Sequence, residues 1–189
     1  MRTLVIHPED RSTEFLKRIY EPIPEATLFT GGVTRDALRR LVDSHDRILM
    51  LGHGSFFGLG SVGRFPESGE FVVDHRFSDL LRQKTECVYI WCYAWKFVKA
   101  NKLAGFTSDM FVSQADEAEE MGISATSVEI EESNEAFGRI VGRHIRKESL
   151  PLFESVCAEY GRLARRNPVA AFNLERLYIR TGEEAYIRA

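Results

Sequence analysis

The stretch from Glu86 to Trp95, with the sequence ECVYIWCYAW, predicts a buried strand that ends at a cysteine. Residues 87–91 are a short apolar run rich in β-branched and aromatic side chains, which is typical of a strand covered on both faces. Apolar residues recur with helical spacing after Tyr93, so Cys92 is expected between the carboxyl end of a strand and the start of a helix. Because the positive end of a helix favours a thiolate, the sequence predicts a reactive cysteine there.

A second stretch is built in the same way. The apolar residues 48–51 predict a buried strand, which is followed at once by Gly52, His53 and Gly54. In open α/β sheets, ligands bind at the carboxyl ends of parallel strands. We therefore expect His53 and Cys92 to lie at the same edge of one sheet and to form a catalytic dyad.

Composition limits the class of protein. The chain has 189 residues, 44% of them hydrophobic, which is enough for one domain with a sizeable core. A net charge of -3 gives no support for a nucleic-acid or membrane-surface partner. The apolar run at the N-terminus is too short for a signal peptide, and no stretch reaches the roughly 20 apolar residues of a membrane span. The sequence thus predicts a cytoplasmic protein without nucleic-acid or membrane partners.

The three cysteines, Cys87, Cys92 and Cys157, have no CxxC spacing, and the chain has no paired histidines. This pattern argues against a disulfide framework and a zinc site, and it fits a reducing compartment. Cys87 and Cys157 fall on apolar faces, so both are predicted to be core residues. We expect neither a metal nor a cofactor.

The first two thirds of the chain alternate between strand and helix patterns. Strands are predicted at residues 3–7, 26–30, 48–51, 87–91 and 106–112, with helices between them, including one that begins after Thr34. The glycine-rich residues 56–74 predict a hairpin or mobile loop beside His53. This order is typical of an α/β fold with three layers, α/β/α, and a mostly parallel sheet over residues 1–125.

The last third of the chain predicts helices within the same single domain, residues 1–189. Three apolar stripes indicate helices at about residues 130–147 and 152–160, and from Pro168 to about Gly182. We expect this helical part, about residues 130–182, to pack on the sheet or to form a small cap. It could also bind a protein partner.

Two other motifs have simpler interpretations. Gly58 to Gly63 spells G-x-G-x-x-G, but it lacks the preceding strand and following helix of a dinucleotide site. Ser55 follows a glycine, but no G-x-S-x-G elbow surrounds it, so it is read as a polar turn residue. Neither motif predicts a cofactor.

An apolar strand into His53-Gly54, a hairpin-like excursion and an apolar strand into Cys92 together resemble the caspase-like group of cysteine peptidases. This group includes caspases, metacaspases, legumains, gingipains, separases and CHAT domains. The resemblance covers about residues 1–115 and rests on pattern: the caspase signature Q-A-C-x-G is replaced by residues 90–94, IWCYA. His53 and Cys92 are 39 positions apart, against roughly 50 in caspases. We assign the broad group and no particular family.

The resemblance implies roles for individual residues. Cys92 would be the nucleophile and His53 the general base or acid, while the backbone N–H groups of Gly54 and Cys92 would form the oxyanion hole. It also implies that the first strand lies between the second and the third.

Specificity is also inferred from the resemblance. Members that cut after Arg or Lys have acidic groups at the floor of the first substrate pocket, and Asp10 and Asp109 are the candidates by position. Members that cut after Asp use arginines, for which Arg64 is the candidate.

We therefore predict a cysteine peptidase that cleaves peptide or protein substrates through an acyl-enzyme. Two alternatives stay open. One is a non-catalytic scaffold of the same fold that binds a partner through its C-terminal helices, because a fold does not determine a function. The other is a flavodoxin-like domain that binds a small anionic ligand at the glycine-rich rim.

Overall fold

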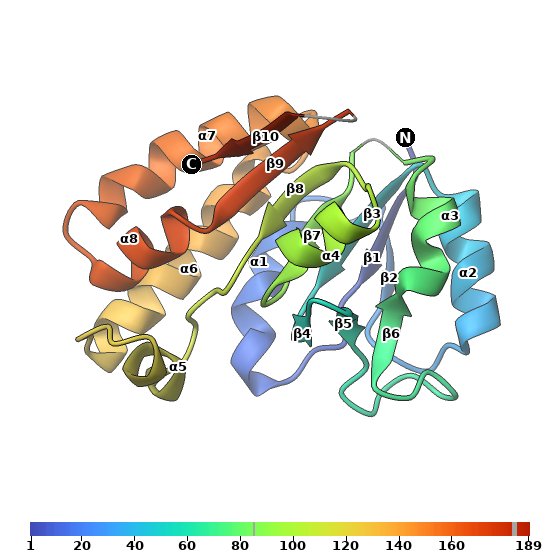
Figure 1. Cartoon of the computed structure of the whole chain (residues 1–189), viewed down its shortest axis with the longest axis horizontal. Coiled ribbons are helices and arrows are strands. Elements are labelled where there is room, and N and C mark those ends of the chain that lie inside the picture. Colours follow the sequence, from blue (N-terminus) through green and yellow to red (C-terminus); the bar gives the residue numbers. More distant parts are fainter. Residues whose placement is uncertain (85, 183–184) are drawn as a thin grey trace.

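The computed structural model describes residues 1–84, 86–182 and 185–189. A seven-stranded sheet with the strand order β10-β9-β8-β7-β3-β1-β2 runs through the molecule (Figure 1). Its strands are β1 (Thr3–Ile6), β2 (Thr27–Phe29), β3 (Arg47–Leu51), β7 (Val88–Ile90), β8 (Gly105–Ser108), β9 (Leu177–Thr181) and β10 (Ala185–Arg188). A smaller antiparallel sheet contains β4 (Gly54–Ser55), β5 (Gly58–Gly60) and β6 (Phe71–Asp74).

The strands β2, β1, β3, β7 and β8 are parallel, and β9 and β10 continue the sheet in antiparallel pairs. Successive side chains of a strand point to opposite faces. In β1, Leu4 and Ile6 therefore belong to one hydrophobic core, whereas Val5 belongs to the other. Both faces of the sheet are apolar because both are covered.

Helices form the two outer layers (Figure 1). One face of the sheet packs against α2, α3 and α4, and the other against α1, α6, α7 and α8. The α-helices are α1 Lys17–Tyr20, α2 Arg35–Ser44, α3 Ser78–Leu81, α4 Ala94–Ala100, α5 Ala115–Glu120, α6 Ser127–His144, α7 Ser149–Ala164 and α8 Pro168–Leu174. Two short 3₁₀ helices are η1 Arg11–Leu16 and η2 His75–Phe77. The predicted three-layer α/β architecture with a mostly parallel sheet is confirmed.

Several local predictions are also confirmed. β1 lies between β2 and β3. Thr34 caps α2, since its hydroxyl oxygen accepts the N–H of Ala37. Asn167 caps α8 in the same way, with Pro168 in the first turn.

The predicted third C-terminal helix is wrong over its second half. Helix α8 ends at Leu174, and the chain then returns to the sheet as β9. Leu177 and Ile179 alternate with more polar residues and are fully buried, and β9 pairs antiparallel with β8. Without β9, the backbone of β8 would be an unpaired edge, so pairing outweighs the local helical pattern.

One further boundary differs from the sequence expectation, because the strand predicted at residues 106–112 ends at Ser108. The hairpin predicted within residues 56–74 is confirmed, since β5 and β6 pair antiparallel, and β4 adds a third strand to it. In the described part of the chain, no helix has both the length and the apolar character needed to cross a bilayer.

Candidate functional site

His53 and Cys92 line one small cavity at the carboxyl edge of the parallel strands. Each follows a strand end, His53 after β3 and Cys92 after β7, and these two strands are paired neighbours. The cavity has a volume of about 20 Å³, which is close to the space of a single water molecule. Its other lining residues come from η1, from the strand ends and from the segment after β8: Thr13, Phe15, Leu16, Gly52, Ile90, Trp91, Phe111, Ser113 and Glu117.

Asp10 and Ser12 hold the imidazole of His53 in place. Its Nε2 atom lies 3.0 Å from Asp10 Oδ2 and 2.8 Å from Ser12 Oγ. The Ser12 hydroxyl donates to Asp10 Oδ1 at 2.6 Å. Within the described residues, Nδ1 of His53 makes no hydrogen bond. Nδ1 is thus the ring nitrogen left to exchange a proton with a ligand or with a nearby side chain.

Asp10 is fixed by the start of η1. Its carboxylate accepts the backbone N–H groups of Ser12 and Thr13, and the Thr13 hydroxyl accepts the N–H of Asp10, which completes a capping box. Partial burial acts to raise the pKa of Asp10, but the hydrogen bonds from Ser12 and the charge of His53 outweigh it and lower that pKa. The turn thus fixes the Asp10 carboxylate beside the imidazole of His53.

His7 connects the end of β1 to this turn. It is fully buried, and its ring nitrogens lie 3.2 Å from Tyr20 Oη and 3.3 Å from Thr13 Oγ1. Burial lowers the pKa of His7 to about 4, so the ring is neutral at pH 7. His7 therefore supports the site as an uncharged hydrogen-bonding group.

Burial favours the protonated thiol of Cys92. Its Sγ atom lies 3.7 Å from the carbonyl oxygen of Phe111, to which it donates. Burial raises the pKa of Cys92 to about 11, and the charges of Glu117 and Asp109 act in the same direction. The expectation that a helix start favours a thiolate here is wrong, because α4 begins only after Tyr93 and burial next to two carboxylates has the larger effect.

The turn after Cys92 is strained and firmly held. Tyr93 has a φ of 66°, a left-handed conformation that is rare for a bulky side chain. The neighbouring Trp91 is buried, and its indole N–H donates to the carbonyl oxygen of Ser55 at 2.9 Å. Its own carbonyl accepts the Ser108 hydroxyl at 3.0 Å. Strain that surrounding contacts maintain is common at functional sites.

The predicted oxyanion residue, Gly54, lies in β4 next to Trp91. A Cβ atom added at Gly54 would meet the Trp91 side chain at 2.3 Å and the carbonyl oxygen of Gly58 at 2.5 Å, so the packing there requires glycine. The cavity lining includes Cys92 and His53 but not Gly54.

The three predicted specificity residues lie in different places. Asp10 contacts His53, as described above. Asp109 follows β8 close to Cys92, and its Oδ1 atom is buried with no hydrogen-bond partner among the described residues. Arg64 is exposed in the loop after β5, and it is not part of the cavity lining.

Sequence reasoning missed Ser12, Thr13 and Glu117. Glu117 lines the cavity, and its carboxylate accepts the backbone N–H groups of Ser113 and Gln114. The spacing of a capping box, at Asp10 to Thr13 and at Gln114 to Glu117, is the signal that could have located both turns.

Searches of family models, of curated proteins and of solved structures found no match for this chain. Within the described residues, no group of three or more His, Cys, Asp or Glu side chains is placed to hold a metal ion. The three cysteines are free thiols. The candidate site therefore rests on its own geometry.

Proposed function

We propose that this chain is a cysteine peptidase of the caspase-like group, with Cys92 as nucleophile and His53 as general base and acid. One observation carries the proposal: these two residues line the same cavity at the carboxyl edge of the sheet, and the carboxylate of Asp10 lies 3.0 Å from Nε2 of the imidazole. Nucleophile, base and orienting group are the three parts that covalent hydrolysis needs. The sheet order, with β1 between β2 and β3, also fits this group.

The reaction starts from a neutral thiol. His53 takes the thiol proton at Nδ1, Asp10 stabilises the resulting imidazolium, and Cys92 Sγ attacks the carbonyl carbon of the peptide bond. The imidazolium then gives its proton to the departing amine, which leaves a thioester. Water, deprotonated by His53, hydrolyses the thioester and restores the thiol. The N–H groups of Gly54 and Cys92 are the proposed donors to the oxyanion.

The substrate binds in a groove beside the cavity. A hollow of about 410 Å³ between η1, the segment at Ser113 and α6 shares Phe15 and Ser113 with the cavity. Because a cavity of about 20 Å³ cannot hold a side chain, substrate must displace the wall next to Cys92. That movement also breaks the contact between the thiol and the carbonyl of Phe111.

Peptides with Lys or Arg before the cleaved bond are the proposed substrates. The carboxylates of Asp109 and Glu117 both act on Cys92, and Asp109 has a buried oxygen atom without a partner in the described residues. A buried acceptor without a partner is costly, and a cationic side chain would satisfy it.

A specific observation also favours the non-catalytic alternative. A thiol whose pKa is about 11 and which already donates to a backbone carbonyl is a poor nucleophile at rest. If substrate does not change this state, the chain is a scaffold with the fold of a peptidase.

Cleavage of a peptide library separates the two functions. We expect the wild-type protein to cut after Lys or Arg, and Cys92→Ala and His53→Ala each to abolish cleavage. The double variant should lose little more than either single variant, because nucleophile and base act as a unit. The matched controls are Cys157→Ala and His75→Ala, which remove the same chemistry elsewhere. Cleavage that survives Cys92→Ala would refute the proposal, and a wild-type protein without any activity would support the scaffold.

A further inference from the structure

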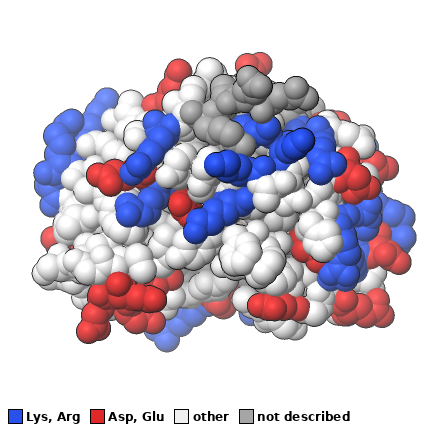
Figure 2. All heavy atoms as spheres, viewed as in Figure 1, with Lys and Arg blue, Asp and Glu red and all other residues white. Residues whose placement is uncertain are grey.

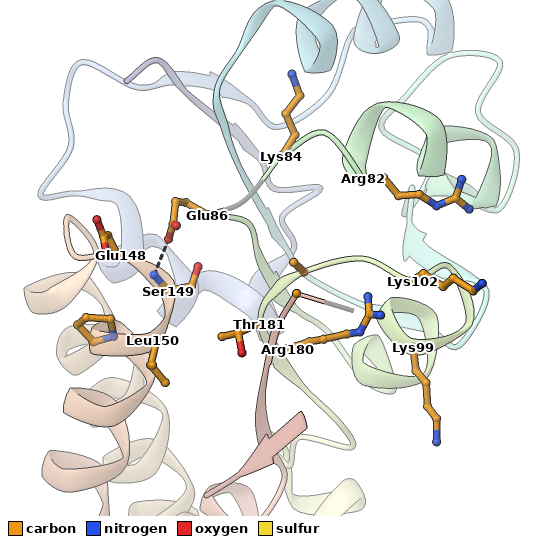
Figure 3. A pocket seen from close by; sticks show the side chains of 13 residues that line it. Arg82, Lys84, Glu86, Lys99, Lys102, Glu148, Ser149, Leu150, Arg180 and Thr181 are labelled. Carbon is orange, nitrogen blue, oxygen red and sulfur yellow. Dashed lines mark hydrogen bonds between the residues drawn. The ribbon is translucent and has the colours of Figure 1, made fainter. Parts of the chain in front are cut away.

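A larger hollow lies at the opposite edge of the sheet from the candidate site. It has a volume of about 910 Å³, within the range of roughly 300–1,000 Å³ typical of small-molecule sites. Figure 3 shows its walls, which come from the ends of α3 and α4, from the segments just before β7 and β8, from the end of β9 and from the start of α7. Cys92 follows the carboxyl end of β7, and His53 follows that of its neighbour β3, whereas the hollow lies at the amino ends of β7 and β8, so the two sites are at opposite edges of the sheet.

Basic side chains dominate one side of this hollow (Figure 3). Its lining contains two carboxylates, Glu86 and Glu148, which lie on the other side. The cations are Arg82, Lys84, Lys99, Lys102 and Arg180. Figure 2 shows Lys and Arg side chains grouped over the upper middle of this face, where Figure 1 places α4 and β9.

Three of these cations, Arg82, Lys84 and Lys102, form no salt bridge with a described residue. Arg82 donates to the carbonyl oxygen of Asn101, and Lys84 donates to that of Asp43. Neither they nor Lys102 form a salt bridge with another described residue. Elsewhere on the surface, arginines pair with carboxylates in several salt bridges, such as Arg146 with Glu25 and Arg166 with Glu132. Within the described residues, the charges of Arg82, Lys84 and Lys102 thus have no salt-bridge partner and can interact with a ligand.

One of the two carboxylates, that of Glu86, already accepts a hydrogen bond. It accepts the backbone N–H of Ser149 at the start of α7, and the backbone carbonyl of Glu86 accepts the guanidinium of the buried Arg47. The N-terminus of α7 thus stabilises this carboxylate on the wall opposite the cations.

Two more observations indicate a binding site. Ser149 lines the hollow and is 7% exposed, and its hydroxyl oxygen is buried without a hydrogen-bond partner in the described residues. Lys102 has a φ of 56°, where glycine is the usual residue at the end of a helix. The chain thus accepts backbone strain at the position that brings this lysine to the hollow.

We propose that this hollow binds a small molecule that carries two or more phosphate groups. Arg82 and Lys84 follow α3 and Lys102 follows α4, so these three cations come from separate segments, and a chain or ring of phosphates can contact more of them than a single anionic group can. Ammonium and guanidinium groups bind phosphate oxygens through charge-assisted hydrogen bonds. The Ser149 hydroxyl completes the set as a neutral donor. This inference is independent of the proposed peptidase activity.

Titration calorimetry with inorganic triphosphate tests the proposal. We expect the wild-type protein to bind triphosphate, and the double variant Lys84→Gln/Lys102→Gln to bind it about tenfold or more weakly. The control, Arg40→Gln/Arg165→Gln, removes two exposed charges elsewhere and should bind as the wild type does. Citrate and a random-sequence DNA oligonucleotide are titrated in parallel, because they offer carboxylates and a polymeric source of phosphate.

A second variant separates binding from folding. Lys102→Gly removes the cation, and glycine accepts the left-handed backbone, so its melting temperature should equal or exceed that of the wild type while triphosphate affinity falls. Absence of triphosphate binding by the wild type would overturn the proposal, as would equal weakening by the control variant. Tighter binding of citrate or of the oligonucleotide than of triphosphate would also overturn it.

Discussion

The two edges of the central sheet have opposite character. At the carboxyl edge, His53 and Cys92 share a cavity of about 20 Å³ with acidic neighbours, and short turns hold the carboxylates of Asp10 and Glu117. At the amino edge, a hollow of about 910 Å³ has more cations than carboxylates in its lining. Helices that connect parallel strands run antiparallel to them, so their negative ends point to the amino edge and favour Lys and Arg there. Strand direction alone thus gives each edge a different electrostatic environment.

The largest expected effect concerns the carboxyl edge. Asp10→Asn keeps the shape of the η1 turn but removes the charge beside His53, so we expect kcat for peptide cleavage to fall about 10³-fold or more, with KM little changed. The matched control is Asp116→Asn on exposed α5. Steady-state kinetics measures both variants, and an unchanged kcat in Asp10→Asn would show that Asp10 does not position the base.

Acid should weaken the carboxyl edge through His7. Its pKa is about 4 when folded and 6.5 when unfolded, so its contribution to stability is complete above pH 6.5 and is lost as the pH falls towards 4. The loss amounts to about 3 kcal/mol in the free energy of unfolding. Urea unfolding of the wild type and of His7→Gln at pH 7 and pH 4 measures it. If the two proteins lose the same stability, His7 is not the group responsible.

Thiol chemistry provides a third way to test the comparison. With a pKa of about 11, Cys92 should have about 100-fold less thiolate at pH 7 than a cysteine of pKa 9. Its alkylation by iodoacetamide should be correspondingly slow and should rise about tenfold per pH unit up to pH 11. Mass spectrometry locates the label, and Cys92→Ala identifies the background from the other two cysteines. Rapid labelling near pH 6 would instead mean that the thiol is activated without substrate.

The smallest expected effect concerns the amino edge. Lys102→Gly should raise the free energy of unfolding by up to about 1 kcal/mol, because φ at this position is left-handed. Lys96→Gly, in the interior of α4, is the control and should lower it by about 1 kcal/mol. Thermal unfolding measures both. A less stable Lys102→Gly protein would mean that the lysine is retained for folding and not for a ligand.

Periodicity predicted most of this fold because local pattern and burial agree in the first two thirds of the chain. Residues 48–51 and 87–91 are continuously apolar, and both contribute strands that are covered on two faces. The pattern failed at residues 177–181, where alternating Leu177 and Ile179 continue directly from a helix and the strand forms only because β8 offers an edge. Because β8 and β9 are far apart in the sequence, their pairing cannot be predicted from the residues of either strand alone.

The site was predicted in part for a similar reason. Glycine-flanked His53 and strand-end Cys92 can be recognised from the sequence, and the fold places both at one cavity. The protonation state of Cys92 could not be read in this way, because it depends on the burial of the thiol and on Glu117 and Asp109, which reach it from later in the chain. Ser12 was missed because its role depends on a contact with His53 across the sheet edge.

The antiparallel strand β9 has a consequence for synthesis. While α6, α7 and α8 emerge from the ribosome, the partner of β8 has not yet been made, and β8 is an exposed edge that could pair with another chain. Non-local pairing of this kind slows folding. The nascent protein is thus most prone to aggregate in the interval between Ser108 and Leu177, and a chaperone that binds extended segments would protect it during that interval.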